Sequence, residues 1–343
     1  MENMNEKILD VKNLSVSFKT YAGVVQAVRG LDFNLKRGET LAFVGESGCG
    51  KTVTAKSIIG ILPKYQTVLG KDSQVILNGR DLLKLNEKEM KNIRGNEISM
   101  IFQDPMTSLN PTMKIGDQIA EGIILHTKKS RSEVYAEVLK ILDLVRIPNA
   151  KVRMKQYPHE FSGGMRQRAV IAIALACNPD MVIADEPTTA LDVTIQAQIM
   201  DLMKDIQKEY NMSTILVTHD LGIVAANADR VQIMYAGKIV ERGTTDEIFY
   251  NAKHPYTWAL LKSVPTLEMK NKEKLYSLMG TPPDLLNPPA GCPFAPRCEY
   301  GMNICRTMEP KVNKFSETHQ VQCWLLHEKA DRNALPESFY KEV

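Results

Sequence analysis

The chain has 343 residues, of which 44% are hydrophobic and 24% charged, and this balance favours a globular protein over a disordered one. Its length predicts a main domain of roughly 250 residues with a smaller appendage. The 43 Lys and Arg residues against 40 Asp and Glu residues give a net charge of +3 without a long run of either sign, so the charge indicates no nucleic-acid partner.

The termini and the apolar stretches indicate where the chain resides. The N-terminal residues are acidic and polar and lack the basic segment and apolar core of a secretory signal. The longest apolar stretch, 169–184, is interrupted by Asn178, Pro179 and Asp180, so it is too short for a membrane helix. We therefore expect a cytoplasmic chain that reaches a membrane only through partner subunits.

The N-terminal part of the chain predicts an antiparallel β region and then a phosphate-binding unit. From Ile8 to Leu35 apolar and polar residues alternate, with turn signals at 22–23 and 36–38. The next predicted strand, Thr40–Val44, runs into glycines and then into a helical segment, Lys51–Leu62. This order of strand, glycine-rich loop and helix is typical of nucleotide-binding proteins.

The following segments predict a helical insert and a mainly parallel sheet. Apolar residues from 112 to about 154 recur at helical spacing. Helices are then predicted at 163–177 and 194–210, and buried strands at 181–184 and 214–217. The parallel pattern ends beyond Gly243, and the chain is proline-rich from Gly280. We expect a domain at 1–250, with a helical subdomain at about 104–178, and a C-terminal extension at 251–343.

The glycine-rich run at 45–52 matches the pattern G-x-x-x-x-G-K-[ST]. Its glycines allow backbone amides to point at phosphate oxygens, and the following helix places its positive dipole end there. Lys51 would reach the β- and γ-phosphates, and the Thr52 hydroxyl would bind Mg²⁺. The loop residues predicted to bind nucleotide are Gly45, Glu46, Ser47, Gly48, Cys49, Gly50, Lys51, Thr52 and Val53.

Other polar residues at strand ends predict the chemistry of ATP hydrolysis. The strand at 181–184 ends in Asp185, which would lie in the Mg²⁺ shell, and Glu186, which would activate water. Gln103 follows another strand and could touch both Mg²⁺ and the attacking water. His219, just after the strand at 214–217, has the chemistry to hold the γ-phosphate.

A second anion site is predicted at Ser162-Gly163-Gly164, at the start of a helix. Two phosphate-binding surfaces for one nucleotide indicate a head-to-tail dimer around ATP.

With these motifs in order, residues 8 to about 330 resemble the ATP-binding subunits of ABC transporters. The resemblance implies an α/β P-loop NTPase core with an antiparallel β subdomain, a helical subdomain and a small cysteine-rich C-terminal extension. In family terms, the motifs are the Walker A loop (45–52), the Q-loop (Gln103), the signature (Ser162 to Gly164), Walker B Asp185 with catalytic Glu186, the D-loop (Ala190, Leu191, Asp192) and the switch His219. The signature departs from LSGGQ at Phe161 and Met165.

The family stacks adenine on an aromatic ring near the first strand, and Phe18, then Tyr21, are the candidates here. The resemblance thus implies ATP and Mg²⁺ as ligands and an ATPase peripheral to the cytoplasmic face of the membrane.

More narrowly, the chain resembles the ATPases of oligopeptide, dipeptide and nickel importers. The segments that carry this are 103–111, 162–168, 185–192 and 280–284. The resemblance implies a second, non-identical ATPase subunit in a heterodimer, two permeases and an extracellular substrate-binding protein. Peptide uptake is the expected function, with nickel or another small solute as the alternative. A DNA-repair ABC ATPase is disfavoured because the long coiled coil of that class is missing.

Cys292, Cys298, Cys305 and Cys323 form a cluster near the C-terminus, with five, six and seventeen residues between successive members. This spacing is looser than in common zinc sites, and in a reducing cytosol it indicates metal before disulfides. A [4Fe-4S] cluster is the preferred ligand, as the resemblance also implies. Zinc, unligated thiols and disulfides are the alternatives.

Overall fold

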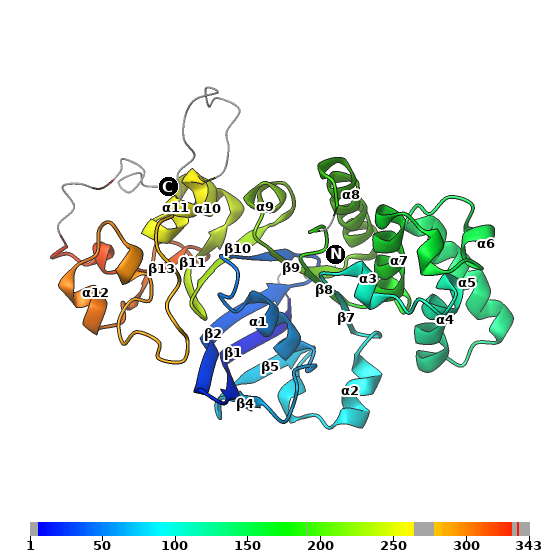
Figure 1. Ribbon diagram of the computed structural model, residues 1–343, viewed down its shortest axis with the longest axis horizontal. Helices are drawn as coiled ribbons and strands as arrows, with labels where there is room; N and C mark the ends of the chain where they lie inside the picture. Colours follow the sequence, from blue (N-terminus) through cyan, green and yellow to red (C-terminus); the bar gives the residue numbers. More distant parts are fainter. Residues whose placement is uncertain (1–5, 190, 264–277, 331–334, 336–343) are drawn as a thin grey trace.

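The computed structural model describes residues 6–189, 191–263, 278–330 and 335. Two sheets form its centre, a five-stranded sheet in the order β2-β1-β5-β6 with β4 on β1, and an eight-stranded sheet in the order β12-β13-β11-β10-β3-β9-β8-β7. Figure 1 shows the helical subdomain and the C-terminal segment at opposite ends of the long axis, with the sheets between them. No helix among the described residues is long and apolar enough to cross a membrane.

The smaller sheet confirms the predicted antiparallel β region. Its strands are β1 (Lys7–Thr20), β2 (Gly23–Lys36), β4 (Thr67–Leu69), β5 (Gln74–Leu77) and β6 (Arg80–Asp81). The apolar residues of β1 are buried at Leu9, Val11, Leu14 and Val16, since one face of the strand packs on the core.

The larger sheet is parallel in its middle, as the alternating strands and helices predict. Strands β3 (Thr40–Val44), β7 (Ile98–Ile101), β8 (Met181–Asp185), β9 (Ser213–Thr218) and β10 (Arg230–Tyr235) pair in parallel. The direction reverses before Gly243, because β11 (Lys238–Thr244) pairs antiparallel with β10 through a tight turn in which Ala236 and Gly237 both have positive φ. The sequence pattern placed this reversal too late.

Helices flank the sheet and build the insert. Near the sheet lie α1 (Lys51–Ile58), α2 (Glu87–Ile93), α8 (Val193–Tyr210) and α9 (Leu221–Asn227). The insert contains α3 (Pro105–Ser108), α4 (Ile115–His126), α5 (Arg131–Leu144), α6 (Ala150–Arg153) and α7 (Gly163–Leu175). Helix α1 ends earlier than predicted, and the residue after its cap, Gly60, has a φ of +68° that a helix does not accommodate.

The described part of the C-terminal segment continues the main structure. Helix α10 (Thr245–Asn251) leads into it, and it contains α11 (Pro255–Lys262), α12 (Asn303–Thr307), β12 (Val312–Lys314) and β13 (Gln320–Gln322). Strand β13 pairs with β11 and so extends the large sheet. Tyr235 packs edge to face with both Tyr256 and Phe294 in one buried cluster. The apolar core therefore crosses the boundary expected near residue 250.

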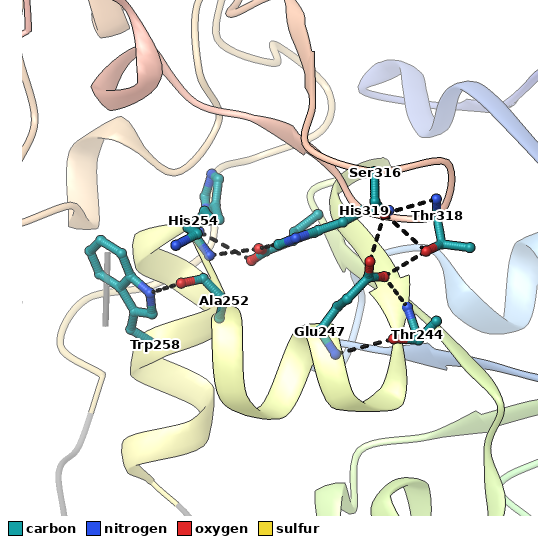
Figure 2. A network of polar contacts seen from close by, with 10 residues as sticks. Thr244, Glu247, Ala252, His254, Trp258, Ser316, Thr318 and His319 are labelled. Atoms are coloured by element: carbon teal, nitrogen blue, oxygen red, sulfur yellow. Dashed lines mark hydrogen bonds and ion pairs between the residues drawn. The ribbon is translucent and has the colours of Figure 1, made fainter. Parts of the chain in front are cut away.

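A buried polar network fastens the same segment (Figure 2). Glu241 on β11 and His319, just before β13, are fully buried, with 2.9 Å between the carboxylate and Nε2. The Glu241 carboxylate also accepts hydrogen bonds from the backbone amides of Lys253 (2.6 Å) and His254 (3.1 Å). These groups are removed from water, so their hydrogen-bonding capacity is satisfied only by one another. Separating them would leave unpaired buried charge.

We expect this network to make stability depend on pH through His254. Burial lowers the pKa of His254 to about 4, with partial opposition from Glu241, while its Nδ1 accepts the Tyr256 amide at 3.1 Å. The unfolded chain binds a proton near pH 6.5 that the folded chain rejects, so stability falls as pH drops from about 6.5 to about 4, by about 3 kcal/mol in all.

Melting temperatures of the wild type and of His254→Asn between pH 7.5 and 4.5 check this expectation. Asparagine retains a side-chain acceptor for the helix start but does not titrate. The wild type should lose stability more steeply on acidification than the variant. Equal slopes would contradict the assignment to His254.

Candidate nucleotide-binding site

The glycine-rich loop joins β3 to α1, as predicted. A Cβ at Gly45 would lie 2.2 Å from the Met234 carbonyl oxygen, and one at Gly50 would lie 2.6 Å from that of Ala27, so backbone packing requires glycine at both positions. Ser47 and Gly48 are exposed at the tip, whereas Cys49 is buried. The loop therefore has a fixed base and an open tip whose amides lie at a helix start, which suits a phosphate.

Lys51 and Thr52 are the first two residues of α1, directly after the glycine-rich loop. The buried Lys51 ammonium donates to the carbonyl oxygens of Gly45 (2.6 Å) and Glu46 (3.0 Å). The Thr52 hydroxyl donates to Asp185 Oδ1 at 2.9 Å. Burial raises the pKa of Asp185, and the Thr52 hydrogen bond opposes this. A hydroxyl beside a buried carboxylate is a set of oxygen ligands that suits Mg²⁺. Val53, the next residue of α1, is half-buried.

Two of the predicted side chains, those of Gln103 and His219, contact the carboxylate of a third, Glu186. Its carboxylate accepts from Gln103 Nε2 at 3.0 Å and lies 3.3 Å from His219 Nδ1. These residues follow β7, β8 and β9, neighbouring parallel strands whose carboxyl ends share one edge of the sheet. The Glu186 backbone has a φ of +48°, and its amide donates to the Val217 carbonyl at 2.8 Å. This unusual conformation holds the carboxylate at the edge.

Thr189 is a further residue of this group, and the sequence motifs do not predict it. Its hydroxyl donates to Glu186 Oε2 at 2.8 Å. The spacing of three residues within the segment that follows β8 could have indicated it, because a turn brings such positions together.

The signature residues lie apart, at the start of α7 in the helical subdomain (Figure 1). Ser162 caps α7 and accepts from the Met165 amide at 3.4 Å, and both Ser162 and Gly163 are exposed. Among the residues that the structure describes, a Cβ at Gly163 would meet only Leu191, at 3.8 Å, whereas one at Gly164 would lie 2.9 Å from Ile195. Asp192 caps α8 by accepting from the Ile195 amide at 3.0 Å, and Ala190 lies outside the described residues.

The two adenine-stacking candidates differ in exposure. Phe18 is half-buried and packs against the core of the smaller sheet, while Tyr21 is fully exposed in the turn between β1 and β2. Tyr21 is thus the more accessible of the two rings, and adenine stacking on Phe18 or Tyr21 stays a prediction.

Two family models match the chain, one for ABC transporters over residues 28–189 and one for the C-terminal region of oligopeptide/dipeptide transporters over residues 240–305. The chain is 57% identical over 332 residues to the oligopeptide transport ATP-binding protein OppD of Bacillus subtilis, covering 97% of this chain and 92% of the relative. The chain belongs to the ABC transporter family. It is an ATPase of that family.

Other comparisons agree. The dipeptide transport ATP-binding protein DppD of Bacillus subtilis is 56% identical over 96% of this chain and 98% of its own length. A solved dimeric ATP-binding cassette in a post-hydrolysis state, bound to ADP and phosphate, superposes with a TM-score of 0.62 at 25% identity, covering 69% of this ATPase and 98% of that chain. The match confirms the ABC ATPase fold.

Three of the C-terminal cysteines, Cys292, Cys298 and Cys305, lie in one apolar cluster, and Cys323 belongs to a second one. Cys292, Cys305 and Cys323 are buried and Cys298 is half-buried, and the Cys292 amide donates to the Cys305 carbonyl at 2.8 Å. Burial raises the pKa of Cys292 to about 11, that of Cys298 to about 12 and that of Cys323 well above its usual value, and neighbouring thiols add to the shift of these three groups. Within the described ranges, however, no group of three or more His, Cys, Asp or Glu side chains is arranged to hold a metal ion.

Proposed function

We propose that this ATPase couples ATP binding and hydrolysis to the uptake of oligopeptides or dipeptides. The single observation that carries the proposal is the convergence of Gln103, Glu186 and His219 beside Thr52 and Asp185, which supplies a water-activating carboxylate next to a magnesium and phosphate site. The peptide substrate is inferred from the printed functions of the oligopeptide and dipeptide relatives, which match along nearly the whole chain.

In the proposed cycle, ATP binds the phosphate loop and the signature of a second subunit closes over the γ-phosphate. Glu186 then takes a proton from the attacking water, while Gln103 and His219 hold the geometry. Ser162 and Gly163 are exposed at the start of α7, where a nucleotide bound to another subunit could reach them. This exposure supports an ATP site that is shared between two subunits.

The proposed complex contains two permeases, an extracellular substrate-binding protein and a second, non-identical ATPase, with this chain peripheral to the cytoplasmic face of the membrane. Residues 103 to about 155 are the proposed contact for the permeases. They contain Gln103, which lies beside the hydrolytic carboxylate, and so they can move with the state of the nucleotide.

Uptake assays in a strain that lacks this gene test the transport proposal. Labelled dipeptide, labelled oligopeptide and labelled nickel should be compared, with complementation by the wild-type gene. Peptide uptake should be lost and then restored, and nickel uptake should be unchanged. Loss of nickel uptake with normal peptide uptake would replace the proposal by the nickel alternative.

For the four cysteines we propose a [4Fe-4S] cluster as a structural staple of the C-terminal segment. A zinc ion, the alternative ligand, would hold its ligand sulfurs about 2.3 Å from one point. A four-iron cluster is a larger object, so its ligands stand further apart, and it is held by four cysteine thiolates such as these. Since the thiol pKa values are raised, loading would release protons.

Anaerobic purification checks this proposal. The protein should be brown, absorb near 400 nm and contain about four iron atoms per chain. Cys298→Ser should lose the colour and the iron, whereas Cys177→Ser, at a cysteine outside the cluster, should keep both. A colourless wild-type protein with stoichiometric zinc would contradict the proposal.

A further inference from the structure

Glu46, the second residue of the phosphate loop, is held at each of its polar groups. Its carbonyl oxygen accepts from Lys51 Nζ at 3.0 Å, and its backbone amide donates to the Tyr256 hydroxyl at 2.9 Å. Its carboxylate is bound by both terminal nitrogens of Arg297, with 3.0 Å between Nη2 and Oε1. Two of its partners, Tyr256 and Arg297, therefore come from beyond residue 250, in the segment that carries the cysteines.

Arg297 is built rigidly into its place. Its side chain is only 4% exposed, its Nε donates to the Met279 carbonyl at 2.9 Å, and Nη1 donates to the Tyr235 hydroxyl at 3.2 Å. It ends a short 3₁₀ turn, 295–297, directly before Cys298. Because backbone and core groups fix the guanidinium on the remaining sides, its fork imposes an orientation on the Glu46 carboxylate.

A carboxylate in a phosphate-binding loop opposes the binding of phosphate. Glu46 lies one residue after Gly45, and an unpaired negative charge there would repel the polyphosphate that the same loop binds. The bidentate Arg297 fork pairs with this charge and neutralises it. The Tyr256 hydroxyl fixes the backbone of the same residue.

We infer that Arg297 is a positioning residue for the phosphate loop, which acts by neutralising and orienting Glu46, with Tyr256 as its partner. Nucleotide affinity then depends on the seating of the cysteine-containing segment against the loop. By linkage, nucleotide binding stabilises that seating by the same factor.

The test measures the dissociation constant of a fluorescent ATP analogue with the full-length chain, together with KM and kcat for ATP. Arg297→Met should weaken binding about tenfold, because a charge-assisted fork is lost and a bare carboxylate is left. The change should appear in the dissociation constant and KM more than in kcat. Tyr256→Phe should weaken binding by a smaller factor.

Rescue separates this role from a general structural one. Adding Glu46→Ala to Arg297→Met should restore most of the lost affinity, because the charge that Arg297 neutralises is then removed. The control is Arg230→Met, which breaks a buried ion pair with Glu39 (2.8 Å) at the opposite end of β3. It should lower the melting temperature and leave nucleotide affinity within about twofold.

Three results would overturn the inference: unchanged affinity in Arg297→Met, equal losses in Arg297→Met and Arg230→Met, or no rescue by Glu46→Ala. If Arg297→Met does not fold, Arg297→Gln and its pair with Glu46→Ala carry the same comparison, since glutamine also removes both the charge and the fork.

Discussion

Glu186→Gln is expected to lower kcat for ATP hydrolysis by about 100-fold or more, while ATP binding is retained. Glutamine has nearly the same shape and can still accept the Thr189 hydroxyl, but it cannot take a proton from water. The neighbours of Glu186 are also hydrogen-bonding groups that hold the side chain in place, namely Gln103 at 3.0 Å and His219 at 3.3 Å. The substitution therefore removes the base and little else.

Steady-state hydrolysis and nucleotide binding by the same preparation measure the two effects separately. Glu209→Gln, an equivalent change at an exposed position on α8, is the matched control and should leave both unchanged. ATP should accumulate on the Glu186→Gln protein without turnover. Near-normal hydrolysis by that variant would remove Glu186 from its assigned role.

The sequence predicted those parts of the site that are determined locally. The glycines of the phosphate loop follow from backbone crowding at Gly45 and Gly50, so the pattern of residues carries the geometry. The meeting of Gln103, Glu186 and His219 was also predictable in outline. Each follows a buried apolar strand, and parallel strands bring their carboxyl ends to one edge.

Other contacts of the site leave no local pattern. Glu46 and Arg297 are 251 positions apart, and neither the spacing nor the residue types indicate that they pair. Tyr256 and His319 likewise acquire their roles from the way the C-terminal segment packs, with β13 added to the sheet beside β11. Composition marked this segment as an appendage because of its prolines and cysteines, but the shared core that joins it to the nucleotide site depends on tertiary contacts.

Gly163→Asp is expected to lower ATP hydrolysis by the assembled ATPase pair by about 100-fold, with normal nucleotide binding to this chain's own phosphate loop. The new carboxylate would stand at the first turn of α7, where the proposed partner's γ-phosphate binds, and would repel it. The helix dipole stabilises an acidic residue at a helix start. The described atom nearest to a Cβ at Gly163 belongs to Leu191, at 3.8 Å, so folding should be preserved.

Gly163→Ala is the matched control, because it adds the same Cβ without a charge and should retain hydrolysis within a few-fold. Substitution at Gly164 would not separate the two effects, since its Cβ would lie 2.9 Å from Ile195 and disturb the packing of α7 on α8. Mixing Gly163→Asp chains with wild-type chains of the proposed second ATPase then locates the defect. Hydrolysis should fail in the composite site that uses this chain's signature. If Gly163→Asp instead weakened nucleotide binding to its own chain, the signature would act in cis and the head-to-tail arrangement would be wrong.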